Sequence, residues 1–239
     1  IGSVASFLDT TVNVDNPRLE CELPVDGSRF EALIPPVVAT PTFTIRKKAI
    51  KIFTLDDYIK SEILTPKQKQ IIEKAILERE NILIVGGTGS GKTTFANAII
   101  AGITRLTPEH RIIIIEDTAE LQCASKNKVV LRTSDKADML RLLKATMRLR
   151  PDRIIVGETR GKEALDLLKA WNTGHPGGIA TVHANSAYGG LTRLEQLISE
   201  VSTTNMSELI AEAVNLVVFI KKTNNGRKIK EIIKISGFN

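Results

Sequence analysis

Residues 82–93 read ILIVGGTGSGKT. After four apolar residues typical of a strand, the loop from Gly86 to Thr93 matches Gly-x-x-x-x-Gly-Lys-Thr, and a helix is predicted directly after it. Glycines let backbone N–H groups turn towards phosphate oxygens, and the amino terminus of the helix favours the same anions. Lys92 can reach the outer phosphates of a nucleotide, and the Thr93 hydroxyl can bind Mg²⁺. The stretch therefore predicts a site for ATP and Mg²⁺ whose nucleotide-binding residues are Gly87, Thr88, Gly89, Ser90, Gly91, Lys92, Thr93 and Thr94.

The sequence on either side of this loop alternates between predicted strands and predicted helices. Several apolar runs are rich in β-branched residues, which is typical of strands buried on both faces of a parallel sheet. Strands are predicted at 82–85, 112–115, 129–132, 154–156, 179–182, 216–221 and 228–235, and helices at 91–105, 136–148, 162–171, 188–201 and 207–214. The last two strands flank Asn224-Asn225-Gly226, a strong signal for a hairpin. The predicted fold class is α/β, with a mainly parallel sheet covered by helices on both faces.

The N-terminal part of the chain has a different pattern. Polar and apolar residues alternate there in short runs, which is typical of strands with one exposed face. Such runs lie at 18–23, 29–34 and 42–47, and the prolines and glycines between them predict turns. We therefore predict a small α+β domain with an antiparallel sheet at 1–52, and we expect it to be incomplete on its own.

A connecting segment joins this N-terminal domain to the nucleotide-binding domain. Thr54 can cap a short helix within 53–65, the segment that we predict to be a linker and a hinge. Thr65-Pro66 then opens a longer helix that runs through Arg79, because proline is favoured at the first helical position. The nucleotide-binding domain is predicted to cover 66–239.

Two acidic side chains at the ends of apolar runs are candidates for hydrolysis chemistry. Glu116 ends one run, and Glu158 follows another after an intervening Gly157. Because the carboxyl ends of parallel strands meet at one edge of a sheet, both should lie at the edge that carries the phosphate loop. The usual P-loop enzyme has an aspartate at the position of Gly157. Mg²⁺ would therefore be supported by Thr93, together with Glu116 or Glu158 through a water molecule.

Other polar residues near these strand ends have two interpretations each. Asp117 and Glu120 can support the same chemistry, or they can merely cap a strand. His183 ends the run 179–182, where it can sense the γ-phosphate, although a lone histidine is often structural. His175 lies in a turn of glycine and proline and is interpreted as a loop former.

Four motifs occur in a fixed order: the phosphate loop, Ile-Glu-Asp at 115–117, Gly-Glu-Thr-Arg at 157–160 and GHPGGIATVHAN at 174–185. Together they resemble the motifs of the secretion ATPase superfamily, which are a Walker A loop, an Asp box, a Walker B motif with glycine in place of aspartate, and a His box. Members of this superfamily power type IV secretion, conjugation, type II secretion and type IV pili. The N-terminal strands and the segment 55–65 are most similar to the conjugative-transfer (Trb-type) and type IV secretion branch.

The resemblance implies a RecA-like P-loop NTPase domain that hydrolyses ATP. It also implies a hexameric ring, with nucleotide bound between the N-terminal and RecA-like domains of each protomer. Arg29 and Arg46 match N-terminal arginines that approach the phosphates, and the alternative for both is an exposed strand charge. Arg148 matches a family arginine that acts across subunits. The implied catalytic residues are Glu158, Glu116, Lys92, His183 and Arg148.

The resemblance further implies partners and a location. We expect a homo-hexamer in the cytoplasm, in peripheral contact with the inner membrane and with inner-membrane components of a secretion or conjugation channel. The machine that is served stays open, since a type IV pilus retraction ATPase or a type II secretion ATPase is the main alternative. Pilus extension ATPases usually carry a four-cysteine zinc site, and this chain has only Cys21 and Cys123.

Two further functions remain as alternatives. A net charge of +6 and a lysine-rich tail suggest a motor that grips DNA itself, but such charges also protect an exposed edge strand. The chain is 4% aromatic, which leaves few rings for stacking on single-stranded bases, so direct DNA binding is not expected as the primary function. A small-molecule kinase could use the same phosphate loop, but the Asp and His boxes argue against it.

Overall fold

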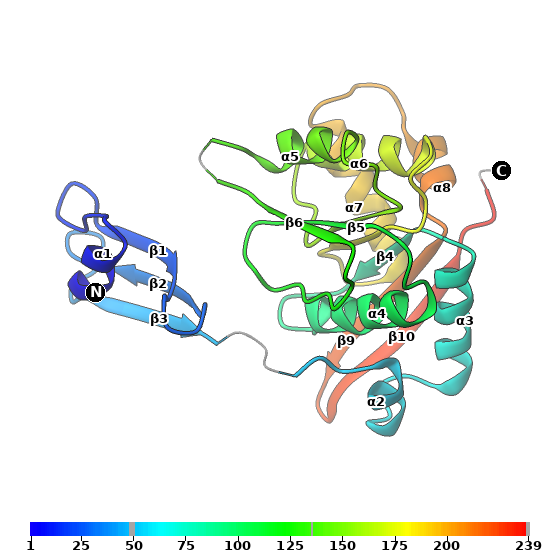
Figure 1. Ribbon diagram of the computed structural model, residues 1–239, viewed down its shortest axis with the longest axis horizontal. Helices are drawn as coiled ribbons and strands as arrows, with labels where there is room; N and C mark the ends of the chain where they lie inside the picture. The colour runs from blue at the N-terminus through cyan, green and yellow to red at the C-terminus, as the bar shows by residue number, and fades with distance from the viewer. Residues whose placement is uncertain (48–50, 135, 238–239) are drawn as a thin grey trace. The chain divides into compact units, whose positions relative to one another are not determined.

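The computed structural model describes residues 1–47, 51–134 and 136–237, which fall into two compact units (Figure 1). The first unit is Ile1–Lys51 and the second is Ile52–Asn239. Each unit encloses its own cluster of buried apolar side chains. Each therefore has the separate core that is expected of a domain.

The first unit is a three-stranded antiparallel sheet with one short helix. Its elements are α1 (Gly2–Phe7), β1 (Arg18–Glu22), β2 (Arg29–Leu33) and β3 (Thr42–Arg46), in the strand order β1-β2-β3. Alternation places Leu19, Phe30 and Ala32 on one face, where Ala5 of α1 packs against them. The predicted sheet is confirmed. The helix α1 was not predicted, because its 6 residues carry too little periodicity to be recognised.

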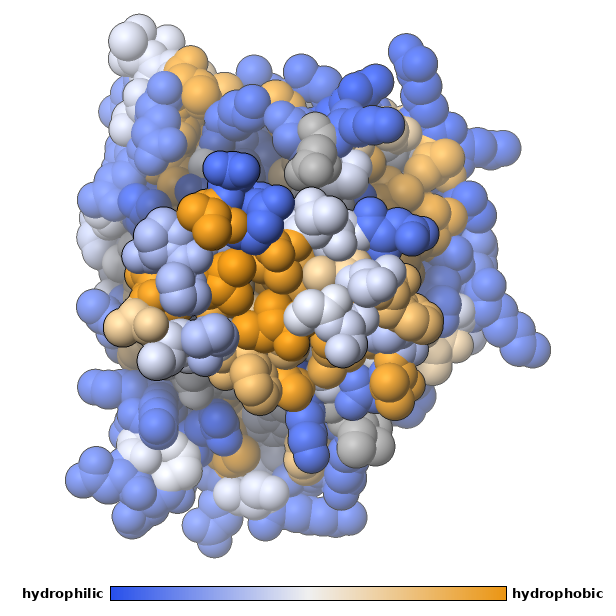
Figure 2. Space-filling model, turned by 90° about the vertical axis from the view of Figure 1, so that its left-hand side faces the viewer, coloured by the Kyte–Doolittle hydropathy of each residue, from blue (hydrophilic) through white to orange (hydrophobic). Residues whose placement is uncertain are grey.

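The apolar face of this small sheet is only partly covered. Phe43 and Ile45 of β3 lie directly across from Ala32 and Phe30, yet they are 58% and 45% exposed. The ring of Phe43 stacks against that of Phe30, with centroids 5.7 Å apart. Figure 2 shows a side of the molecule on which apolar residues gather in the middle and hydrophilic residues surround them.

The second unit is built on a seven-stranded sheet. Its strands are β4 (Ile82–Val85), β5 (Ile112–Glu116), β6 (Lys128–Arg132), β7 (Arg153–Val156), β8 (Ile179–Val182), β9 (Leu216–Thr223) and β10 (Gly226–Lys234). The order across the sheet is β10-β9-β4-β8-β7-β5-β6. All neighbours are parallel except β10, which forms the predicted hairpin with β9.

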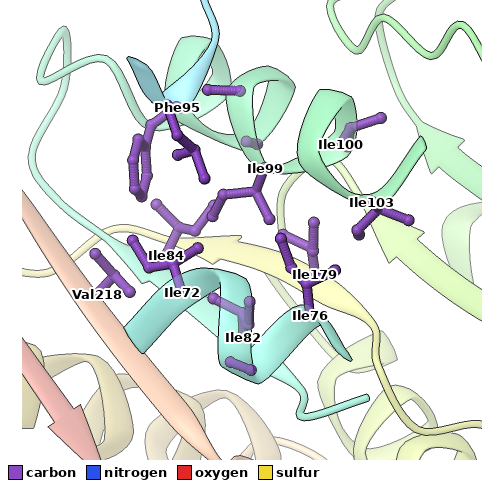
Figure 3. Packing of buried hydrophobic residues seen from close by; sticks show 14 of the residues in the cluster. Ile72, Ile76, Ile82, Ile84, Phe95, Ile99, Ile100, Ile103, Ile179 and Val218 are labelled. Atoms are coloured by element: carbon purple, nitrogen blue, oxygen red, sulfur yellow. The ribbon is translucent and has the colours of Figure 1, made fainter. Parts of the chain in front are cut away.

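Helices cover both faces of this sheet (Figure 1). They are α2 (Leu55–Lys60), α3 (Pro66–Leu77), α4 (Lys92–Leu106), α5 (Met139–Thr146), α6 (Glu163–Asn172), α7 (Ala187–Ser199) and α8 (Ser207–Ala213). Ile82 and Ile84 of β4 face α2, α3 and α4, and Figure 3 shows this packing around Ile99. Leu83 and Val85 point to the other face, where α5, α6, α7 and α8 lie. The predicted α/β class is confirmed.

Two of the helix boundaries that differ from the prediction have a clear local cause. The helix predicted at 136–148 begins only at Met139, because the Asp138 carboxylate accepts a hydrogen bond from the N–H of Arg141 and caps the helix there. The helix predicted to run through Arg79 ends at Leu77, since Arg79 has a φ of 56° and so cannot continue a right-handed helix.

The segment predicted as a linker contributes to the core of the second unit. Thr54 caps α2, as predicted, in a capping box with Asp57. Leu55, Tyr58 and Leu64 are each at most 4% exposed, in the same cluster as α4. That 53–65 acts as a hinge stays a prediction, and these contacts mean that most of the segment packs with the second unit.

Candidate active site

The carboxyl ends of the parallel strands form the edge on which the predicted site residues meet. The phosphate loop follows β4, Glu158 follows β7 and His183 follows β8, and these strands are neighbours in the order β4-β8-β7. Glu116 is the last residue of β5, one strand further on. The parallel topology therefore brings together Lys92 and His183, which are 91 residues apart in the chain.

Glycines shape the phosphate loop in two ways. Gly89 and Gly91 have φ values of 68° and 95°, which other residues rarely adopt. A Cβ atom at Gly86 would lie 2.4 Å from the Ser90 hydroxyl and 2.5 Å from the carbonyl oxygen of Ile220, so the loop can close only around glycine there. These constraints leave the loop wound tightly at the amino end of α4.

Lys92 holds this loop from within. Its side chain is largely buried, and Nζ donates hydrogen bonds to the carbonyl oxygens of Gly86 at 2.9 Å and Gly87 at 3.1 Å. Burial lowers the pKa of Lys92, and the negative charge of Glu158 partly opposes that effect. The ammonium group is therefore placed where phosphate oxygens would enter the loop.

His183 connects Lys92 to Glu158. Its Nε2 lies 2.6 Å from Oε1 of Glu158, and its Nδ1 lies 3.2 Å from Nζ of Lys92. Burial and then the positive charge of Lys92 lower the pKa of His183, which favours the neutral imidazole. A neutral ring protonated on Nε2 satisfies both contacts, because it donates to Glu158 and accepts from Lys92.

Glu116 is buried and fixes the loop that follows β5. Its Oε2 accepts hydrogen bonds from the backbone N–H groups of Glu120 and Leu121, both at 2.9 Å. A Cβ atom at Gly157 would lie 3.2 Å from the Cβ of Glu116. The glycine found in place of the usual aspartate is thus explained by a tight contact, since Glu116 fills the space beside it.

Arg160 is a site residue that the sequence reasoning did not single out. Its Nη2 donates a short hydrogen bond to Oε2 of Glu158, and its Nη1 lies 3.7 Å from Oδ2 of Asp117. The bond to Glu158 raises the pKa of Arg160. Asp117 also accepts a hydrogen bond from the Thr133 hydroxyl at 2.9 Å, so it links this arginine to the end of β6. Arg160 could have been noticed as the last residue of the Gly-Glu-Thr-Arg motif. Its contact with Asp117 could not be predicted from the sequence, because the two residues follow different strands.

Thr93 is the residue of the phosphate loop that is predicted to hold Mg²⁺. Thr93 lies in the first turn of α4 and is partly exposed. Within the described ranges, no group of three or more histidine, cysteine or acidic side chains could hold a metal ion. Mg²⁺ commonly takes few protein ligands and completes its shell with phosphate oxygens and water, so the Thr93 hydroxyl fits such an ion.

The three other predicted arginines lie on elements other than these strand ends. Arg29 and Arg46 lie in the first unit, directly across from each other on β2 and β3, and Arg29 forms an ion pair with Glu20 at 2.9 Å. Arg148 follows α5 and is exposed. Their contact with phosphates stays a prediction. His175 lies near the carbonyl oxygen of Pro151, at 3.1 Å from Nδ1, as expected of a loop former.

Comparison with known proteins places the chain among secretion proteins. The family model described as "Type II/IV secretion system protein" matches residues 12–228. The chain is 56% identical to a probable conjugal transfer protein TrbB of Sinorhizobium fredii, over 100% of this chain and 73% of that relative. It is 29% identical to the type IV secretion system protein VirB11 of Bartonella henselae, over 96% of this chain and 76% of that relative.

Solved structures are similar over most of the chain. The VirB11 ATPase of the Brucella suis type IV secretion system, in complex with sulphate, has a TM-score of 0.64 at 28% identity, and the match covers 98% of this chain and 78% of that one. The pilus retraction motor PilT with bound ADP has a TM-score of 0.69 at 24% identity, covering 91% and 63%, and this likeness is one of fold. The predicted RecA-like fold is thereby confirmed. Every helix in the described ranges is too short or too polar to span a bilayer.

Proposed function

The chain belongs to the family of type II/IV secretion system proteins, and on this premise we propose that it is the ATP-hydrolysing motor of a conjugative-transfer or type IV secretion machine. One observation carries the proposal: His183 joins the phosphate-loop lysine to Glu158 at the edge of the sheet. This arrangement places a carboxylate beside the loop that would hold the γ-phosphate. A carboxylate in that position can orient and deprotonate water, which hydrolysis requires.

In the proposed reaction, four residues have distinct roles: Glu158, Lys92, Thr93 and Glu116. Glu158 accepts a proton from a water molecule whose oxygen forms a bond to the γ-phosphorus, while the bond to the β–γ bridging oxygen breaks and ADP leaves with the electron pair. Lys92 exchanges its contacts with loop carbonyls for phosphate oxygens and stabilises their charge. Mg²⁺, held by Thr93, supplies further positive charge when it is bound. Glu116 keeps the loop after β5 in place beside Glu158 and can support the ion through water.

The assembly and location are also part of the proposal. The resemblance to secretion ATPases and the conjugal transfer relatives support a homo-hexamer at the cytoplasmic face of the inner membrane, in contact with components of a channel. In that ring, Arg29 and Arg46 of the N-terminal domain and Arg148 of a neighbouring protomer would approach the phosphates. Hydrolysis would then move the N-terminal domain relative to the RecA-like domain.

The substitution Glu158→Gln tests the reaction. We expect ATP binding to be retained and turnover to fall by about 100-fold or more, because the amide cannot accept the proton. Glu109→Gln is the matched control, since Glu109 is an exposed glutamate that precedes β5 at the opposite edge of the sheet. Binding of fluorescent ATP and release of phosphate measure the two effects. Near wild-type turnover in Glu158→Gln would contradict this role.

The machine that is served can be identified by crosslinking and affinity purification from the native host. Recovery of conjugation-channel components would support the proposal. Recovery of pilus platform proteins would favour the alternative of a pilus retraction motor. The likeness to PilT is one of fold and does not distinguish these two functions. Strong, salt-sensitive stimulation of turnover by DNA would favour a motor that grips DNA itself.

A further inference from the structure

The hairpin of β9 and β10 places an arginine on the outside of the phosphate loop. Nη2 of Arg227 lies 3.4 Å from the carbonyl oxygen of Gly89, at hydrogen-bonding distance. Its Cδ and Nε atoms lie 2.9 Å from the position that a Cβ atom at Gly91 would occupy. The left-handed glycine and the arginine therefore fit against each other, and the side chain lies along the loop instead of extending into solvent.

No acidic partner accounts for this position. The residue directly across the hairpin from Arg227 is Lys222, and like charges in that relation repel. Both belong to the face of the hairpin that carries Ile220 and Ile229, which pack in the core with α4. Among the described residues, no ion pair forms with Arg227. A simple structural salt bridge is therefore not the reason for its contact with the loop.

Strand order shows which part of a nucleotide would meet this arginine. Glu158 and His183 follow β7 and β8, on one side of β4, so the γ-phosphate must lie towards that side. The hairpin β9–β10 lies on the other side of β4. A nucleoside triphosphate whose phosphates lie along the loop thus directs its ribose and base towards the hairpin and Arg227.

Aromatic side chains lie on the same side of the loop. Burial raises the pKa of Tyr58, and the positive charge of Arg227 nearby partly opposes that effect. Phe53 packs edge-on against Tyr58, with ring centroids 6.5 Å apart, and is 37% exposed. A planar guanidinium group next to apolar surface suits the face of a nucleobase, because such groups stack on aromatic rings.

We propose that Arg227 binds the nucleoside end of ATP, stacking on the base and donating hydrogen bonds to the ribose, so that the C-terminal hairpin forms part of the nucleotide site. This inference rests on the proposed ATPase function. The hairpin would then respond directly to whether a nucleotide or only phosphate occupies the loop.

The test compares a nucleotide with a ligand that has the same phosphates but no nucleoside. Titration calorimetry of Arg227→Gln with ATP and with inorganic tripolyphosphate should show ATP binding about tenfold weaker and tripolyphosphate binding changed by less than about twofold. Lys228→Gln is the matched control, because Lys228 lies on the opposite face of the hairpin and its loss removes the same charge. It should leave both affinities unchanged.

Each contrary outcome is distinguishable. Equal weakening for ATP and tripolyphosphate would overturn the inference, since Arg227 would then act on the phosphates or on the loop itself. Unchanged ATP binding in Arg227→Gln would overturn it as well. If the wild-type protein binds no ATP at all, the proposed function fails instead. Tripolyphosphate binding also reports that the loop of each variant is folded.

Discussion

At the scale of single residues, the proposed base is restrained from two sides. Arg160 contacts one carboxylate oxygen of Glu158 and His183 contacts the other. Each carboxylate oxygen can still accept a hydrogen bond from water, but both contacts lower the basicity of the carboxylate towards that water. Arg160 is the easier to displace, because its side chain is 60% exposed.

We therefore expect Arg160→Gln to raise the basal turnover of ATP, by up to about fivefold, the factor that corresponds to the loss of one exposed ion pair. Arg160→Lys keeps the charge and should stay closer to the wild type. Phosphate release at saturating ATP measures the effect. A fall in turnover would instead show that Arg160 acts on the phosphates.

His183 should make stability depend on pH in a defined direction. Its pKa is lowered in the folded protein, so the unfolded chain binds more protons as the pH falls below about 6.5. Stability from this site is therefore present above that pH and declines below it. Thermal unfolding should show a smaller advantage of the wild type over His183→Gln at pH 5.5 than at pH 7.5. An advantage that does not change with pH would contradict this assignment.

At the scale of elements, one buried arginine ties several segments together at the amino ends of the strands. Arg153 of β7 is 1% exposed and donates to the carbonyl oxygens of Ile76 and Gly177 and to Nδ1 of His110. Burial lowers its pKa to about 10, so it still carries its charge at neutral pH. The segments it joins are the end of α3, the turn before β8 and the turn before β5.

Arg153→Met should lower the free energy of unfolding by about 2–4 kcal/mol, because it leaves these buried acceptors without partners. Lys126→Met, at an exposed loop position, is the control and should change it little. Denaturant unfolding measures both. ATP binding should persist in the folded fraction, because the site lies at the other edge of the sheet.

The elements also show what a sequence can and cannot predict. Short runs rich in β-branched residues predicted β4 and β8 to the residue, since strands buried on both faces leave a simple pattern. The predicted start of α5 is wrong by three residues, because the Asp138 side chain caps the helix and fixes its first turn at Met139. Arg153 and Arg227 could not be recognised, because their contacts join segments that are 77 and 138 residues apart.

At the scale of the whole molecule, the division of the chain into two units allows a direct test of the domain boundary. A fragment that begins at Ile52 keeps α2, whereas one that begins at Pro66 lacks Leu55, Tyr58 and Leu64. We expect the first fragment to fold and bind ATP. The second should be less stable by several kcal/mol, because loss of one large buried side chain alone costs about 2–5 kcal/mol. Equal thermal stability would show that 53–65 is a free linker.

The position of Lys92 has a consequence for nucleotide binding and product release in the proposed reaction. Its ammonium group donates hydrogen bonds to two carbonyl groups of its own loop. These carbonyl groups compete with a phosphate for the ammonium group of Lys92. Part of the free energy of phosphate binding is therefore offset by the hydrogen bonds that the phosphate must replace. The same carbonyl groups would favour release of the product, because Lys92 regains these hydrogen bonds as the product leaves. In the proposed reaction, such a loop would bind nucleotide less tightly and would release the product more readily.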